Sequence, residues 1–69
     1  MTAYTVMLFQ EAYPQQIEIN KCRQENGRIY AQFWFLNQDK TPHMLLFDGS
    51  FPNEEAIEQT VQKLLDYKL

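Results

Sequence analysis

The strongest constraint on the fold is the Asn26-Gly27 pair together with the aromatic segment after it, residues 28–37, which reads Arg-Ile-Tyr-Ala-Gln-Phe-Trp-Phe-Leu-Asn. An Asn-Gly pair between two runs of strand-forming residues is a strong short-range signal for a β-hairpin. The segment also holds four of the ten aromatic residues, including the only Trp. We therefore expect residues 28–37 to form the central strand of a small sheet.

The strand before this turn is predicted at residues 16–25, because Ile17 and Ile19 alternate there with polar residues. A two-residue type I′ turn needs positive φ at both central positions, which Asn26 and Gly27 tolerate. Such a turn fixes the register of the hairpin. The predicted pairs are Cys22 with Ala31, Ile19 with Trp34 and Ile17 with Leu36.

Two further strands and a helix complete the expected fold. A nearly continuous apolar run predicts a strand at residues 4–10, and Pro14 marks a loop at 11–15. A strand at 43–48 follows a polar turn and Pro42, and Asp48-Gly49-Ser50 reads as another turn.

The last segment has the pattern of an amphipathic helix. Asn53 is a suitable N-cap, acidic residues crowd the first turn, and lysines lie toward the end. The apolar stripe consists of Ile57, Val61, Leu64 and Leu65. The predicted fold class is α+β, a four-stranded and mostly antiparallel β-meander with one C-terminal helix packed on one face.

Length and charge limit the classes of function. The 69 residues are enough for one domain, 1–69, and leave a marginal core. A net charge of −3 with scattered basic residues is a poor match for a phosphate backbone, so we expect no nucleic-acid partner. The segment after Gly27 resembles the base-stacking strand of RNA-recognition modules only loosely, because Ile29 stands where that motif has Gly.

The expected location is the cytoplasm. The N-terminal residues have no basic region and only a short apolar run, so they do not read as a signal peptide. No stretch approaches the length of a membrane span, and we expect no membrane association. The single cysteine, Cys22, fits a reducing compartment.

No residue pattern points to catalysis. A triad of Cys22, His43 and Asp48 is excluded by the predicted pairing, because Cys22 and His43 lie four or five residues apart along the sheet, about 13–16 Å. One His and one Cys do not make a zinc site, and two glycines do not make a phosphate-binding loop. We expect no enzyme, no metal and no cofactor.

The second face of the sheet is the candidate site, because one helix can cover only one face. A four-residue loop at 38–41 puts Leu45 and Phe47 on the face of Trp34, and Met44 and Leu46 on the face of Phe33 and Phe35. The uncovered face then carries large apolar residues that a stable monomer seldom leaves bare. A three- or five-residue loop would exchange the two sets of side chains on the following strand, and a different hairpin register would expose Tyr30 and Trp34 instead. The interface candidates are Phe33, Phe35, Met44, Leu46, Tyr30 and Trp34.

These observations favour a small non-enzymatic protein-binding module, of the inhibitor or accessory-subunit type. It is expected to act through its aromatic sheet face, as a homodimer or in a heteromeric complex. The alternative is a small-ligand-binding protein or minor enzyme, with a pocket between helix and sheet that uses Tyr30, Cys22 or His43.

Overall fold

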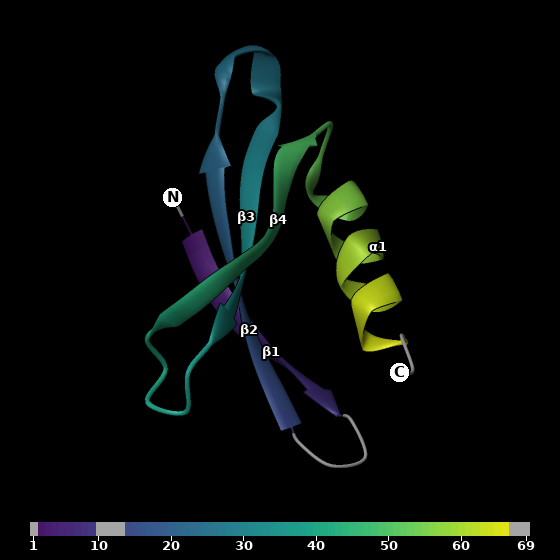
Figure 1. The fold of residues 1–69 in the computed structure, drawn as a ribbon. Coiled ribbons are helices and arrows are strands. Elements are labelled where there is room, and N and C mark those ends of the chain that lie inside the picture. Colours follow the sequence, from purple (N-terminus) through teal and green to yellow (C-terminus); the bar gives the residue numbers. More distant parts are fainter. Residues whose placement is uncertain (1, 10–13, 67–69) are drawn as a thin grey trace.

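The protein forms one antiparallel four-stranded sheet with a helix across one of its faces (Figure 1). The computed structural model describes residues 2–9 and 14–66. Its strands follow one another in the order β1-β2-β3-β4, so neighbours in sequence are neighbours in the sheet. The predicted α+β meander with a C-terminal helix is confirmed. The elements are β1 (Thr2–Phe9), β2 (Pro14–Arg23), a 3-10 turn η1 (Glu25–Gly27), β3 (Ile29–Leu36), β4 (Pro42–Phe51) and α1 (Glu54–Leu65).

The β2–β3 hairpin closes with three residues rather than the predicted two. The Gln24 N–H donates to the Arg28 carbonyl oxygen at 2.7 Å, and η1 lies between them. Asn26 and Gly27 do adopt positive φ, 64° and 75°. The residue types were therefore interpreted correctly, but the loop contains Glu25 as well.

The extra loop residue moves the hairpin register by one position, so the predicted pairs are wrong. Ile19 lies opposite Phe33 rather than Trp34, and Ile17 lies opposite Phe35. Because side chains alternate between the faces, this slip exchanges the two faces of β3 relative to β2. It places Phe33 and Phe35 on the side of Ile17 and Ile19.

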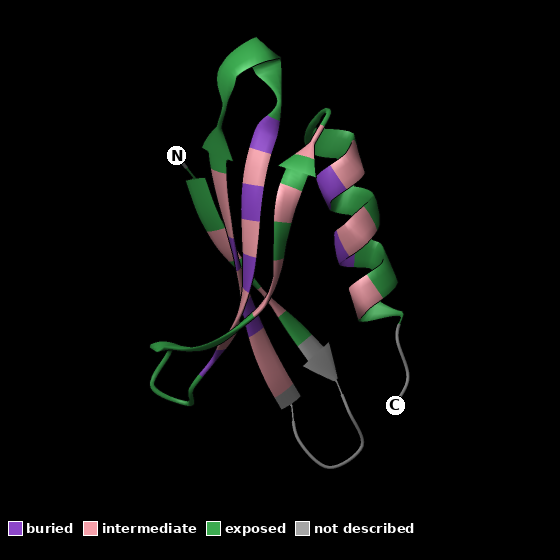
Figure 2. Ribbon diagram, turned by 45° about the horizontal axis from the view of Figure 1, so that its top comes forward, coloured by how far each residue is buried: buried purple, intermediate pink, exposed green. Residues whose placement is uncertain are grey.

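The hydrophobic core lies between α1 and the sheet. Phe33 is fully buried at its centre and stacks on Phe47 of β4, with ring centroids 4.4 Å apart. Figure 2 shows the buried positions of β3 alternating along the strand and those of α1 facing the sheet. The buried cluster consists of Ile17, Ile19, Ile29, Ala31, Phe33, Ile57 and Val61.

Strand β4 is longer and less regular than predicted. The expected turn at Asp48-Gly49-Ser50 is wrong, because these residues continue the strand opposite Gln32, Ala31 and Tyr30. Arg28 holds this end in place, since its Nε donates to Ser50 Oγ at 2.9 Å. Two register shifts interrupt the pairing, between Phe33 and Trp34 and between Phe35 and Leu36 of β3.

The start of the chain agrees less closely with the predicted boundaries. The first strand begins at Thr2 rather than residue 4, and Gln10 lies outside the described residues. Pro14 and Gln15, predicted in a loop, belong to β2. The rest of that predicted loop, residues 11–13, also lies outside the described residues.

Helix α1 begins where its capping signal predicts. The Asn53 side chain accepts the Ala56 N–H at 2.9 Å, and acidic residues occupy the first turn. Ile57 and Val61 are buried against the sheet, and Leu64 is half-buried. Leu65 remains 40% exposed, so the apolar stripe is narrower than predicted.

Candidate functional site

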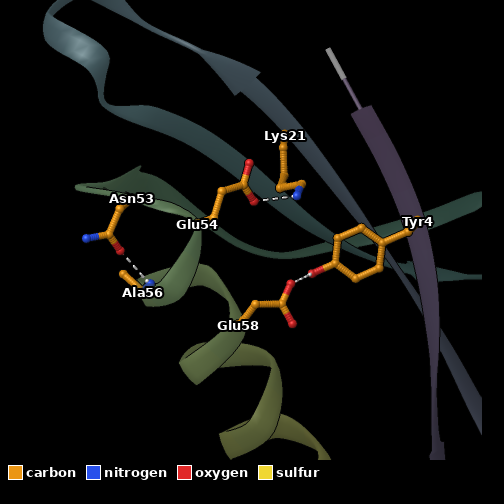
Figure 3. A network of polar contacts seen from close by, with 6 residues as sticks. All are labelled: Tyr4, Lys21, Asn53, Glu54, Ala56 and Glu58. Atoms are coloured by element: carbon orange, nitrogen blue, oxygen red, sulfur yellow. Dashed lines mark hydrogen bonds and ion pairs between the residues drawn. The ribbon is translucent and has the colours of Figure 1, made fainter.

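Polar contacts between helix α1 and the sheet hold the two together (Figure 3). Lys21 Nζ lies 2.6 Å from Glu54 Oε2, and the Tyr4 hydroxyl donates to Glu58 Oε1 at 3.1 Å. Lys21 Nζ also lies 5.2 Å from the centroid of the Tyr4 ring. Burial, and then the hydrogen bond to Glu58, raise the pKa of Tyr4 to about 12. These contacts attach α1 to β1 and β2.

The opposite side of the sheet, which we call the open face, carries no helix in the described part of the chain (Figure 1). The observed register assigns its members, because cross-strand partners share a face. From β1 and β2 these are Ala3, Thr5, Met7, Gln16, Glu18, Asn20 and Cys22. From β3 and β4 they are Tyr30, Gln32, Trp34, Leu36, Leu45, Asp48 and Ser50.

Trp34 lies at the centre of the open face. It is half-buried, and it pairs with Glu18 on one side and Leu45 on the other. Its indole Nε1 donates to Gln32 Oε1 at 3.2 Å, which fixes the orientation of the ring. Two exposed apolar side chains lie on the same face, Met7 at 39% and Leu45 at 38% exposure. The face therefore carries exposed apolar side chains among polar groups that include the Glu18 carboxylate.

Tyr30 occupies the end of the open face nearest the η1 turn. Its hydroxyl donates to Asp48 Oδ2, and this hydrogen bond is the main reason why the pKa of Tyr30 is raised. The contact joins β3 to β4 across the face. Asp48 and Glu18 contribute two carboxylates to this surface.

A hollow of about 500 Å³ lies at the other end of the open face. Leu36, which is 5% exposed, forms part of its lining but not of the main core cluster. The β3–β4 loop closes nearby, where Asp39 accepts the Thr41 hydroxyl at 2.6 Å and the Thr41 N–H at 3.1 Å. These bonds lower the pKa of Asp39. The hollow is lined by Met7, Gln15, Gln16, Leu36, Asn37, Gln38 and His43.

The structure separates the six predicted interface residues. Trp34 and Tyr30 lie on the open face, as the alternative register predicted. The placement of Phe33 and Phe35 there is wrong, because the three-residue turn puts both on the helix side, Phe33 in full burial and Phe35 packed against the core.

The two predicted residues of β4 are also away from the open face. Met44 is 54% exposed, but it pairs with Phe35 on the helix side of the sheet. Leu46 lies at the first register shift and packs against the core cluster. Leu45 shares a face with Trp34, as the four-residue loop predicted, whereas the prediction that Phe47 does so is wrong, since the shift pairs Phe47 with Phe33.

Cys22 and His43 do not meet. Cys22 pairs with Tyr30, and His43 lies at the second register shift, beside Leu36. Six residues of β3 separate these positions, about 20 Å at 3.3 Å per residue. Within residues 2–9 and 14–66, no group of three or more His, Cys, Asp or Glu side chains could hold a metal ion.

Some open-face residues were absent from the predicted set. These include Glu18, which lies opposite Trp34, Gln32, which accepts the indole N–H, and Met7, which lies on the outer strand β1 opposite Gln16. The alternation of Ile17 and Ile19 with Glu18 does predict the position of Glu18, because a residue between two core residues of a strand lies on the other face of the sheet. Met7 was hidden by the nearly continuous apolar run of β1, which has no alternation to assign its faces.

Comparison with protein-family models, curated proteins and solved structures gave no match to this chain. The helix that the structure describes is too short to cross a membrane. The arguments for function therefore depend on the open face and on its surroundings.

Proposed function

We propose that this protein is a small non-enzymatic binding module, of the inhibitor or accessory-subunit type, that docks on another protein chain through the open face. The observation that carries the proposal is the position of Trp34, held by Gln32 on a sheet face that no described element covers. The chain that docks there is a second copy or a different protein.

The composition of the open face supports a protein partner. Aromatic residues and Met are enriched at the centres of protein interfaces, and charged residues are depleted there. Trp34 and its cross-strand neighbour Leu45 are apolar residues of this kind, and Met7 adds a third on β1. Glu18, opposite Trp34, and Asp48 are the acidic groups of the face. Each Å² of apolar area removed from water by a partner contributes about 25 cal/mol.

The preset orientation of the Trp34 ring also supports binding. A side chain already fixed in one rotamer loses less conformational entropy when a partner docks. The hydrogen bonds of Trp34 to Gln32 and of Tyr30 to Asp48 restrict two aromatic rings of this face. Both are residue types that commonly dominate binding energy.

A differential capture experiment tests this function. Immobilised wild-type protein and the variants Trp34→Asp and Gln59→Asp are exposed to extract of the native host, and each retained protein is then purified and titrated. Gln59 is an exposed residue of α1, so Gln59→Asp controls for the added charge. A partner that binds wild type and Gln59→Asp but not Trp34→Asp supports the proposal. Equal binding to all three proteins contradicts it.

A small ligand is the second candidate, and the hollow beside His43 is the observation in its favour. Its volume of about 500 Å³ is within the range of small-molecule sites. Of the three residues named for this alternative, His43 lines the hollow, which lies on the open face rather than between helix and sheet. A saturable rise in melting temperature with a small molecule, lost in His43→Ala, would favour this candidate.

The cytoplasm is the proposed compartment. Cys22 is exposed and is the only cysteine of the chain, so it has no partner for an internal disulfide. A reducing environment keeps such a thiol free.

A further inference from the structure

The two outer strands of the sheet are protected to very different degrees. An outer strand presents unpaired backbone N–H and C=O groups, and proteins limit pairing there with proline, charge or irregular register. Strand β4 begins at Pro42, carries Asp48, and is interrupted by two register shifts. Its outer edge is therefore a poor template for another strand.

Strand β1 has none of these protections. Thr2–Phe9 contains no charged residue and no proline. It pairs with β2 in unbroken register, from Thr2 opposite Lys21 to Phe9 opposite Pro14. In the strand order β1-β2-β3-β4, no described strand pairs with the edge of β1 that faces away from β2 (Figure 1). Alternate backbone groups of β1 thus point outward along a regular edge.

We infer that the outer edge of β1 pairs antiparallel with β1 of a second copy, about a two-fold axis at Thr5, and joins the two sheets into one eight-stranded sheet. This inference goes beyond the proposed function, because it uses the edge of the sheet and leaves the open face available.

The side chains of β1 favour a second copy as the occupant of this edge. A two-fold axis at Thr5 puts Tyr4 opposite Val6 of the second copy, so helix-side residues meet helix-side residues. On the open face Ala3 then lies opposite Met7 of the second copy. Tyr4 and Val6 are half-buried against the core, and Met7 is 39% exposed. Because β1 carries no charged side chain, the two paired strands bring no like-charged side chains of their own together.

The contrast between the two edges also explains why the assembly stops at two copies. A symmetric pair of β1 strands uses up both unprotected edges, and the outer strands of the joined sheet are the two β4 strands. Their Pro42 and register shifts oppose further pairing. A closed two-fold dimer is the result, rather than a filament.

Sedimentation velocity of the full chain, from micromolar to millimolar concentration, measures the assembly directly. We expect wild type to pass from monomer to dimer without higher species. Amide hydrogen exchange over the same range should slow selectively in β1 as the dimer forms. An isotope-filtered contact between Thr5 residues of a labelled and an unlabelled copy places the axis. A wild type that stays monomeric at millimolar concentration overturns the inference.

Thr5→Lys and Leu45→Lys form a matched pair of variants. Thr5 is exposed and lies opposite Glu18 on β2, so a lysine there is compatible with the monomer fold. At the two-fold axis, however, it places two ammonium groups side by side and should weaken dimerisation up to about fivefold. Leu45→Lys adds the same charge to the same face on the opposite edge strand and should dimerise like wild type.

A third variant separates this inference from the proposed function. Trp34→Asp should leave the β1 dimer intact even if it abolishes binding of another protein to the open face. Loss of the dimer in Trp34→Asp, or in Leu45→Lys but not in Thr5→Lys, would overturn the inference and place self-association on the open face. If Thr5→Lys fails to fold, the exchange and isotope-filtered measurements on wild type decide the question.

Discussion

Phe33 of β3 and Phe47 of β4 stack across the sheet at 4.4 Å between centroids, with their ring planes 21° apart. The register shift beside Trp34 brings Phe47 rather than Leu46 opposite Phe33. Phe51 approaches the same ring at 6.2 Å in a tilted arrangement. Phe33 thus joins the aliphatic core cluster to two partly buried aromatic rings of β4 on the helix side of the sheet.

Phe33→Ala should remove the centre of this core. A buried Phe-to-Ala change costs about 3–5 kcal/mol, which in so short a chain is enough to unfold much of the population. Urea denaturation followed by circular dichroism measures the loss. Trp34→Ala, at the adjacent but half-buried position, is the control and should cost less. Equal losses would mean that the two faces have been assigned wrongly.

Ile57→Ala and Leu65→Ala test the packing of α1. Ile57 is fully buried against the sheet, so its truncation should cost about 2–5 kcal/mol. Leu65 is 40% exposed, and its truncation should cost a small fraction of that. A comparison of the two unfolding midpoints gives the answer. A large effect of Leu65→Ala would show that the helix is rotated from its described position.

Gly27→Val and Gly49→Val compare a turn glycine with a strand glycine. No atom lies within 4 Å of a Cβ at either position, so the first side-chain carbon meets open space in both variants. Gly27 has φ 75°, where a β-branched residue is strained, and we expect a loss of about 1–2 kcal/mol. Gly49 lies in β4, where Val suits the extended backbone and should not destabilise. Thermal melts that rank the variants in the opposite order would contradict the three-residue turn.

Tyr4 should make the protein less stable at high pH. Its pKa is raised from 10.0 to about 12 in the folded state. The unfolded chain therefore loses this proton first, and the stabilisation, complete below pH 10, is lost as the pH rises toward 12. Urea denaturation over this range should show a steeper decline for wild type than for Tyr4→Phe. Parallel curves would mean that Tyr4 ionises alike in both states.

Asn53→Ala tests the start of α1. The Asn53 side chain accepts the Ala56 N–H at 2.9 Å, and loss of an N-cap typically costs about 1 kcal/mol. Asn53→Asp keeps the acceptor and adds a favourable charge at the helix N-terminus, so it should match or exceed wild-type stability. Thermal unfolding of the three proteins measures the difference. Equal loss in both variants would indicate that the amide nitrogen, rather than the acceptor oxygen, is required.

The sequence was sufficient to predict the order of the elements, because alternation at Ile17 and Ile19 and the stripe from Ile57 to Val61 are local patterns. The N-cap at Asn53 was predicted for the same reason. Loop length was not predictable in this way. Asn26 and Gly27 suit positive φ in a two- or a three-residue turn, and nothing local decides whether Glu25 belongs to the strand or the loop.

The candidate site was predicted only as an alternative, since every face assignment depends on that loop. Trp34 and Tyr30 lie on the open face because the hairpin adopts the alternative register rather than the one predicted from a two-residue turn. Burial favours the observed choice, because it gathers Ile29, Ala31 and Phe33 under the helix. The shifts in β4 depend on cross-strand packing and had no signal in residues 43–48.

The length of the η1 turn determines which side chains of β3 lie on the open face. Because side chains alternate between the two faces of a sheet, adding or removing one residue in the turn exchanges the faces of one strand relative to its neighbour. Loss of one codon at Glu25 would leave every other residue of the chain unchanged, yet the geometry of a two-residue turn would then oppose the burial of Phe33 beneath the helix. A change in turn length is thus a single genetic step that bears on which side chains of β3 face the helix and which lie on the open face.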